Sequence, residues 1–343
     1  MSKRNAAGEG VVKVAILGAG RIAHTMADTL VRMAADERYA SLIEPYAVAT
    51  RNDPERAQAF ADRYGLKVAY GSYEQLLADD EVDLVYIATP HSLHAEQVLQ
   101  CVAAGKNTLV EKSFAGNAIQ TVRALSAAEE AGLLCTEAIW TRYMPSRSMI
   151  TDLIDAGEIG TVHAVTANLA YPVTDKARMT DPNLAGGALL DVGVYPLNFI
   201  AMALPDAYPG RIVATANLTD KGVDEQLSAT LWMDNGIMGV MSCSMVAYGD
   251  RKGIIWGDKG FIVVENVNNP QRIDVYDDDF ACVRQIPVPA QLTGYEYEVA
   301  SAAKAVLEGR GECTEMPHRE TVRIMKLMDD MRTQCGVVYP FER

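Results

Sequence analysis

Residues 11–23 read VVKVAILGAGRIA, and this stretch decides the fold of the first part of the chain. Apolar and β-branched residues fill positions 11–17, which is typical of a buried strand. Glycines at 18 and 20 end that run, and an amphipathic stretch from Arg21 to about Met33 follows. A strand, a glycine turn and a helix in this order form the context in which the GxGxx(G/A) pattern binds a dinucleotide.

Each small residue of this turn has its own steric task. Gly18 permits the tight turn, Gly20 lets a pyrophosphate approach the backbone, and Ala23 lets the helix pack close to the sheet. The free N–H groups at the helix start, where Arg21 and Ile22 lie, favour the negative charge of the phosphates. The alternative is a glycine turn in a domain that holds no nucleotide, and the repeated strand–helix pattern that follows argues for the nucleotide site.

Apolar runs and amphipathic stretches alternate through the first 140 residues. The sequence predicts strands at 45–50, 82–89, 107–111 and 133–139, separated by helices that include 93–104 and 117–131. Between the first two of these strands, Asp53 is a plausible N-cap, Pro54 a first helical residue and Gly65 a stop signal. Alternating elements imply right-handed βαβ crossovers, so we expect an α/β Rossmann dinucleotide-binding domain over residues 1–140.

The pattern changes after about Trp140. Helices are predicted over 146–156, 188–204, 295–307 and 319–335, and 160–173 reads as a strand. From 211 to about 286, short apolar runs succeed one another with turn signals such as Asp-Asn-Gly, which predicts a meander of antiparallel strands. We therefore expect a second α+β domain over 141–343, used for substrate binding and oligomerisation.

The overall charge restricts the partners. The formal net charge of the 343-residue chain is −14, and such a protein is repelled by phosphate backbones and by anionic membranes. The charge therefore argues against nucleic acid and membrane partners. An anionic cofactor needs a local pocket of N–H groups and one or two cations.

The cysteines and the first residues indicate a compartment. The six cysteines are scattered and none forms a CxxC pair, which favours a reducing compartment with no disulfide framework and no metal site. The start, MSKRNAAGEG, lacks the apolar core of a signal peptide, and no uninterrupted apolar run reaches the roughly 18 residues of a spanning helix. We expect a cytoplasmic protein.

The end of the second strand indicates the cofactor. An acidic residue there would bind the ribose 2′-hydroxyl of NAD, but this chain has Ala49-Thr50-Arg51-Asn52. Arg51 can bind a 2′-phosphate or stack on adenine, and Thr50 can donate its hydroxyl. These residues favour NADP, with NAD as the alternative; the other interpretation of Arg51 is a solvated loop residue.

Several further motifs follow in a fixed order, at positions 89–94, 103–114, 137–145, 186–196 and 294–310: TPHSLH, AAGKNTLVEKSF, EAIWTRYMP, GGALLDVGVYP and GYEYEVASAAKAVLEGR. In this order they resemble the glucose–fructose oxidoreductase / inositol dehydrogenase (Gfo/Idh/MocA) family. The similarity is greatest to the branch that contains dimeric trans-1,2-dihydrodiol dehydrogenases and NADP-dependent D-xylose dehydrogenases. It extends over nearly the whole chain after the first ten residues.

The resemblance implies a second domain with a large open, mostly antiparallel sheet that serves in a dimer or other homo-oligomer. It also implies a catalytic lysine and a catalytic tyrosine, which fall on Lys112 and Tyr195 here, and an aspartate beside the substrate, which falls on Asp191. The cofactor site is expected to include Thr89, Pro90, His94, Glu111 and Lys112, besides the glycine turn and the residues at 50 and 51.

Two positions depart from the family pattern. Ser113 follows the lysine where the family has proline, so the chain either keeps a cis bond before a residue other than proline or reshapes this loop. Ala185 precedes Gly186 and Gly187 where the family often has a third glycine, which we regard as minor.

These residue types suit the oxidation of a carbinol. A free tyrosine titrates near pH 10, and a neighbouring ammonium group lowers that value, so Tyr195 assisted by Lys112 can exchange the hydroxyl proton. Asp191 would orient the substrate or the base. The alternatives are a surface lysine, a helix-capping aspartate and a core tyrosine.

Aromatic and basic residues near the end of the first domain are candidates for substrate contact. Trp140, Arg142 and Tyr143 suit stacking on a sugar or a diol and hydrogen-bonding to its hydroxyls, or equally a packing cluster between domains. Tyr295 is a weaker candidate. His91 can contact nicotinamide or substrate, and His94 can instead stabilise a helix start. No third ligand lies near the two histidines, which argues against zinc.

The sequence thus predicts an NADP(H)-dependent dehydrogenase that acts on a carbinol carbon of a sugar, polyol or cyclic diol. Two alternatives remain open. One is a redox-neutral, NAD-dependent glycosidase of the same family, and the other is a nucleotide-binding regulator without catalysis.

Overall fold

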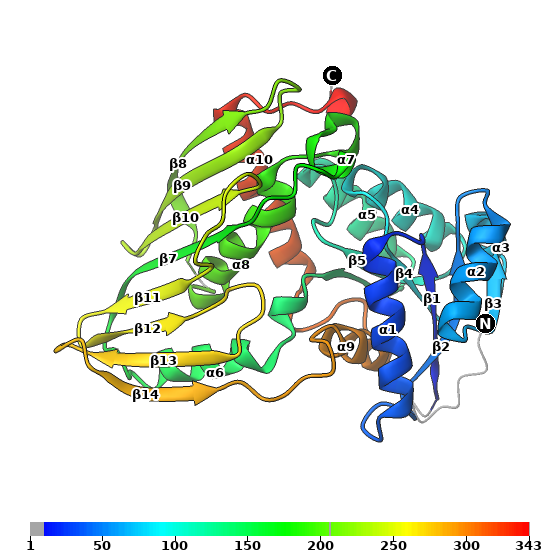
Figure 1. Cartoon of the computed structure of the whole chain (residues 1–343), viewed down its shortest axis with the longest axis horizontal. Coiled ribbons are helices and arrows are strands. Elements are labelled where there is room, and N and C mark those ends of the chain that lie inside the picture. The colour runs from blue at the N-terminus through cyan, green and yellow to red at the C-terminus, as the bar shows by residue number, and fades with distance from the viewer. Residues whose placement is uncertain (1–9, 206, 343) are drawn as a thin grey trace. The chain divides into compact units, whose positions relative to one another are not determined.

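The computed structural model describes residues 10–205 and 207–342, which fold into two compact units (Figure 1). Unit 1 contains residues up to 140 together with 291–322, and unit 2 contains 141–290 together with 323 onward. Residues 1–9, on which the expectation about a signal peptide rests, lie outside the described part of the chain.

Unit 1 is built on a parallel sheet of six strands in the order β3-β2-β1-β4-β5-β6. The strands are β1 (Val12–Leu17), β2 (Ile43–Ala49), β3 (Val68–Tyr70), β4 (Leu84–Ile87), β5 (Asn107–Glu111) and β6 (Cys135–Ala138). The helices between them are α1 (Arg21–Ala35), α2 (Pro54–Tyr64), α3 (Tyr73–Leu77), α4 (His91–Ala103) and α5 (Ala118–Glu130). The strand order reverses between β1 and β4, which is where open α/β sheets bind their ligands.

Local sequence signals account for these elements. β1 and β4 are almost wholly buried, as their apolar runs predict. In α2, the carboxylate of Asp53 accepts the N–H of Arg56, Pro54 opens the helix, and Gly65 ends it in the left-handed conformation. The α/β class and the Rossmann arrangement predicted from the sequence are confirmed. The short β3 and α3 were not predicted, because three to five residues carry too little periodicity.

The segment 291–322, which the sequence assigns to the second domain, is part of unit 1. Its helix α9 (Glu296–Glu308) buries an apolar face and packs near α1, β1 and β5. Two contacts fix the segment: the hydroxyls of Thr29 and Thr293 lie 2.8 Å apart, and the Cys135 N–H donates to the Gly311 carbonyl at 3.0 Å. The chain therefore returns to the Rossmann sheet after the meander, which periodicity along the sequence does not reveal.

Unit 2 contains a sheet of eight strands in the order β14-β13-β12-β11-β7-β10-β9-β8. The strands are β7 (Val162–Ala170), β8 (Pro209–Leu218), β9 (Asp224–Met233), β10 (Met238–Ser244), β11 (Gly253–Gly257), β12 (Gly260–Val264), β13 (Arg272–Asp277) and β14 (Cys282–Pro287). All neighbours are antiparallel except β7 and β10. The predicted open, mostly antiparallel sheet is therefore confirmed.

One face of this sheet packs against α8 (Val194–Ala203), which lies over β7, β10 and β11 (Figure 1). The approach is close, since a Cβ placed on Gly253 would lie 2.4 Å from the Phe199 ring. The remaining helices are α6 (Pro145–Asp155), α7 (Ala177–Thr180) and α10 (His318–Cys335), the last of which crosses the boundary between the units. The strands alternate buried and exposed residues, so the other face of the sheet is open.

The helical stretch Pro182–Ala203 has the length and composition of a membrane span, with a mean hydropathy of 1.4 in its most apolar window. It contains Asp191, so it was not recognised as an uninterrupted apolar run. In the structure, 94% of that window is buried inside the molecule. Such burial is that of a core helix, which is apolar all round because protein surrounds it.

Candidate active site

The glycine turn between β1 and α1 has the geometry that a pyrophosphate requires. Gly18 has a φ of +107°, and a Cβ placed on it would lie 3.1 Å from the carbonyl oxygen of Ala88 at the end of β4. Gly20 is the N-cap residue of α1, and it provides no side-chain hydrogen bond to the helix start. Gly20 therefore does not cap the first N–H groups of α1, and these groups can bind an anion.

The loop after β2 gathers positive charge beside this turn. Arg51 is exposed, and no acidic residue stands at the strand tip. Burial raises the pKa of Tyr73, and the positive charges of Arg51 and Arg56 act in the opposite direction, so both guanidinium groups lie near that ring. Arg56 also donates to the carbonyl of Ala19 in the glycine turn at 2.6 Å. The hydroxyl of Thr50 donates at 2.5 Å to the Asp53 carbonyl.

Arg56 was missed by the sequence reasoning. The available signal was a basic residue one turn into the helix that follows the second strand. Its contact with the glycine turn joins residues 37 positions apart, and only the fold brings them together.

His94 connects the tip of β4 to the loop after β5. Its two ring nitrogens lie 2.7 Å from the carbonyl oxygen of Thr89 and 3.0 Å from that of Ser113. Burial lowers the pKa of His94, while the hydrogen bonds to these carbonyl oxygens act in the opposite direction. The neighbouring Pro90 precedes the first residue of α4, His91, whose ring meets the His94 ring edge-on at 5.8 Å. Both histidines are buried in unit 1.

The peptide bond between Lys112 and Ser113 is cis. Of the two possibilities that the sequence left for this loop, the chain therefore keeps a cis bond before a residue other than proline. The carboxylate of Glu111, at the end of β5, accepts the hydroxyl of Tyr86 and, at 3.1 Å, the backbone N–H of Lys112. Glu298 of α9 is fully buried close to this carboxylate. The charge of Glu111 raises the pKa of Glu298, and the charges of both glutamates raise the pKa of Tyr86. Unit 1 thus places an ordered acidic group directly behind the lysine.

Asp191 and Tyr195 lie about one turn apart in unit 2. Asp191 belongs to a π-helical turn, Leu189–Gly193, which continues directly into α8. The two residues are 4% and 6% exposed, respectively. A guanidinium nitrogen of Arg178 lies 2.5 Å from a carboxylate oxygen of Asp191 and forms an ion pair. Arg178 was also missed, because a basic residue in the short preceding helix α7 carries no pattern that identifies its partner.

The remaining substrate candidates fall into different units. Trp140 stacks on Tyr295 within unit 1, with ring centres 4.4 Å apart and an interplanar angle of 3°. Arg142 and Tyr143 begin unit 2 and are buried, and Arg142 donates to the side-chain oxygen of Asn198 in α8 at 2.8 Å. The contact of Trp140 with Tyr295 lies within unit 1, and that of Arg142 with Asn198 lies within unit 2.

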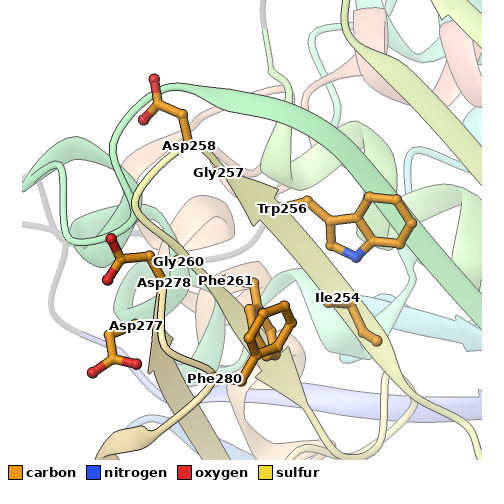
Figure 2. Close-up of a pocket in the computed structure, with 9 residues that line it drawn as sticks. All are labelled: Ile254, Trp256, Gly257, Asp258, Gly260, Phe261, Asp277, Asp278 and Phe280. Atoms are coloured by element: carbon orange, nitrogen blue, oxygen red, sulfur yellow. The ribbon is translucent and has the colours of Figure 1, made fainter.

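A hollow of about 330 Å³ lies on the sheet of unit 2. Figure 2 shows aromatic side chains at one end of it and carboxylates at the other. Its lining residues are Ile254, Trp256, Gly257, Asp258, Gly260, Phe261, Asp277, Asp278 and Phe280. None of the predicted site residues belongs to this set, so the hollow is a separate surface.

Comparison with known protein families gives two matches. Residues 12–139 match the model of an oxidoreductase family with an NAD-binding Rossmann fold, and residues 148–263 match the GFO/IDH/MocA C-terminal domain. Similar curated proteins include trans-1,2-dihydrobenzene-1,2-diol dehydrogenase from Danio rerio, with 32% identity over 94% of this chain and 97% of the relative. Another is the NADP⁺-dependent D-xylose 1-dehydrogenase from Hypocrea jecorina, with 34% identity over 96% and 93%.

Among solved structures, a 3-ketoreductase from Actinomadura kijaniata in complex with NADP and TDP-benzene has a TM-score of 0.84. It is 27% identical and covers 95% of this chain and 98% of its own. Both halves of the fold, the glycine turn and the identity over nearly the whole length agree, and this chain belongs to the Gfo/Idh/MocA family of oxidoreductases.

Proposed function

We propose that the protein is an NADP(H)-dependent oxidoreductase that transfers a hydride between nicotinamide and a carbinol carbon of a sugar, polyol or cyclic diol. The observation that carries this proposal is the glycine turn at the point where the strand order reverses, with Arg56 hydrogen-bonded to it and Arg51 near the same tyrosine, Tyr73, as Arg56. The relatives that oxidise a dihydrodiol or D-xylose support the substrate class.

The residues at this turn fit the phosphates of NADP. The start of α1 offers N–H groups to the pyrophosphate, and the absence of a Cβ at Gly18 and Gly20 leaves the backbone accessible. Arg51 and Arg56 would hold the 2′-phosphate, since a guanidinium group pairs well with phosphate oxygens. A carboxylate at the strand tip would repel that phosphate, and residues 49–52 contain none.

When bound, the nicotinamide supplies the acceptor or donor of the hydride. We propose that Tyr195 exchanges the carbinol proton and that the ammonium group of Lys112 stabilises its phenolate. Arg178 forms an ion pair with Asp191, and a carboxylate in such a pair suits an acceptor of a substrate hydroxyl better than a proton donor. Glu111 would hold the Lys112 backbone through its N–H.

A screen of pentoses, hexoses, inositols and cyclic diols, each with NADP and with NAD, tests this function by the absorbance of the reduced nicotinamide. We expect turnover with NADP and at least one carbinol, and strong loss of turnover in Lys112→Ala and Tyr195→Phe with retained NADP(H) binding. Full turnover of either variant would refute its catalytic role. Release of a sugar without net reduction would instead identify the glycosidase, and no hydride transfer with any compound would favour the regulator.

We also propose that the open face of the unit 2 sheet joins copies of this chain. Trp256, Phe261 and Tyr276 face one another across β11, β12 and β13, and the rings of Phe261 and Tyr276 stack at 4.6 Å. Phe280, which is 78% exposed, extends this aromatic row (Figure 2). Exposed aromatic groups of this extent are typical of protein interfaces. Sedimentation of Trp256→Glu beside the unaltered protein tests it, and an unchanged oligomeric state would exclude this surface.

The cellular location follows as a further proposal. Cys101, Cys135, Cys243 and Cys313 are buried as free thiols, and Cys282 is exposed as a free thiol. We propose a cytoplasmic location, where such thiols stay reduced. Fractionation of the native host with an antibody against the protein tests it.

A further inference from the structure

A buried carboxyl group holds the start of the segment that carries Asp191 and Tyr195. Asp224 is the first residue of β9 and is 0% exposed. Its Oδ2 accepts the backbone N–H of Leu189 at 2.6 Å, across 35 positions of sequence. Leu189 opens the π-helical turn that continues into α8, so this bond lies at the first residue of that turn.

Close packing explains the two glycines before this turn, and one of them lies against the same carboxyl group. Gly187 has a φ of +126°, and a Cβ placed on it would lie 2.2 Å from Oδ1 of Asp224. A Cβ on Gly186 would lie 2.7 Å from the carbonyl oxygen of Met179. Both distances are shorter than side chains tolerate, so the two glycines permit the backbone to lie directly against Asp224 and against the Met179 carbonyl of α7.

Asp224 acts as a helix cap supplied by a distant strand. The first N–H groups of a helix have no acceptor within the helix, and Ala188, which precedes this turn, provides no side-chain cap. A carboxyl group at this end satisfies such a donor and interacts favourably with the helix dipole. The far side of the turn is equally constrained, since a Cβ on Gly193 would lie 2.8 Å from the sulfur of Cys243.

A second contact holds the same turn from the C-terminal end of the chain. The hydroxyl of Tyr339, which is fully buried, donates to the carbonyl of Gly186 at 2.8 Å. Arg332 lies over the Tyr339 ring at 4.5 Å and pairs with Glu342 at 2.8 Å. The turn at 186–189 is therefore fixed by two elements of unit 2 that are remote in sequence.

The charge of Asp224 changes near neutral pH. Burial raises its pKa to about 7, while the Leu189 N–H and the positive charge of Arg332 act in the opposite direction. Cys243 of β10, Cys335 of α10 and Tyr339 are further titratable groups that interact with it. A carboxylate accepts an N–H more strongly than a protonated carboxyl group does, so the strength of this cap follows its ionisation.

We propose that Asp224 is a positioning residue of the oxidoreductase, which sets the direction in which the next helical turn presents Asp191 and Tyr195. This proposal rests on the function proposed above. It assigns Asp224 no contact with substrate or cofactor: the residue acts through the backbone of Leu189.

The test compares Asp224→Asn and Asp224→Ala with the matched control Asp234→Asn, which changes a carboxyl group just beyond the other end of β9. The readouts are kcat, KM, the pH profile of kcat, NADP(H) affinity, and amide hydrogen exchange of peptides that cover 187–196. For Asp224→Ala we expect a fall of kcat of about 10- to 100-fold, the effect of a small misplacement of reacting groups. Exchange in 187–196 should rise by about tenfold or more, whereas the affinity for NADP(H) should stay within about twofold.

The Asn variant keeps one acceptor oxygen and the size of the side chain. We therefore expect it to fold, to lose less kcat than the Ala variant, and to lack the change of kcat near pH 7 that Asp224 contributes. The control should match the unaltered protein in every readout.

Unchanged exchange in 187–196, or an unchanged kcat and pH profile beside a lowered melting temperature alone, would overturn the positioning role. If the unaltered protein turns over no carbinol, the proposed function fails by itself, and hydrogen exchange still decides whether Asp224 anchors this turn.

Discussion

Two glutamates of α9 provide a sharp test of how burial and hydrogen bonding set stability. Glu296 and Glu298 lie two positions apart in unit 1, and both are at most 1% exposed. The carboxylate of Glu296 accepts three backbone N–H groups, those of Leu292, Thr293 and Gly294, at 2.6–3.0 Å. Neither oxygen of Glu298 has a hydrogen-bond partner within residues 10–205 and 207–342. The same side chain thus occurs once satisfied and once unsatisfied in one helix.

The sign of the pH effect follows from the environment of Glu298. Burial raises its pKa well above the ordinary value of 4.5, and the charge of Glu111 acts in the same direction. Above pH 4.5 the unfolded chain releases this proton and the folded protein retains it, so stability falls as pH rises. While the folded protein stays protonated, the slope is about 1.4 kcal/mol per pH unit. Between pH 5 and 7.5 the upper limit of this effect is therefore about 3 kcal/mol.

Glu298→Gln removes the titration and keeps the shape. The amide has its own cost of burial, but that cost is the same at every pH, so the difference between two pH values isolates the carboxyl group. We expect the variant to gain stability relative to the unaltered protein between pH 5 and 7.5, by at most about 3 kcal/mol. Glu296→Gln should instead lose about 1–3 kcal/mol at pH 7.5, because an amide nitrogen cannot accept the backbone N–H groups.

Urea unfolding, followed by the fluorescence of Trp140, measures the unfolding free energy of unit 1 at each pH. Trp232 and Trp256 belong to unit 2, and replacing both with Phe leaves Trp140 as the reporter. The measured quantity is the difference in unfolding free energy between the Glu298→Gln variant and the unaltered protein. If this difference changes by less than about 1 kcal/mol between the two pH values, the reasoning is refuted. The reasoning is also refuted if Glu298→Gln loses as much stability at pH 7.5 as Glu296→Gln does.

Three further predictions concern the site. Gly18→Val should abolish NADP(H) binding in a fluorescence titration, because a side chain there would meet the Ala88 carbonyl at about 3.1 Å, and retained affinity would contradict the phosphate role of the turn. Arg51→Asp should weaken NADP binding by about 10- to 100-fold and leave NAD binding nearly unchanged. The variant loses one or two charge-assisted hydrogen bonds to the 2′-phosphate and adds a repulsive charge. Equal effects on both cofactors would show that Arg51 does not bind the 2′-phosphate. Arg178→Met should lower kcat about tenfold or more and cost roughly 1–3 kcal/mol in thermal unfolding, since it removes a cation paired with the buried Asp191 carboxylate. An unchanged kcat would exclude a catalytic role for this pair.

The Rossmann half of the molecule could be predicted from the sequence because the patterns that specify its strands, turns and helices are local. A buried strand, a glycine turn and a helix succeed one another within 25 residues, and Asp53, Pro54 and Gly65 mark the ends of α2 by hydrogen bonds and dihedral angles of their own. The same locality gave the strands of the meander. The motifs that carry Lys112, Asp191 and Tyr195 were identified by resemblance, since residue type alone leaves a surface lysine or a core tyrosine equally acceptable.

Only the tertiary structure decided which distant residues support those motifs. Arg56 binds the glycine turn, Arg178 pairs with Asp191, and Asp224 holds Leu189. Each contact joins residues from different elements, and nothing in the local sequence specifies the partner. The return of 291–322 to the first sheet and the parallel pair of β7 and β10 are of the same kind. Periodicity determines what a segment forms, whereas burial against other segments determines where it lies and which charges it meets.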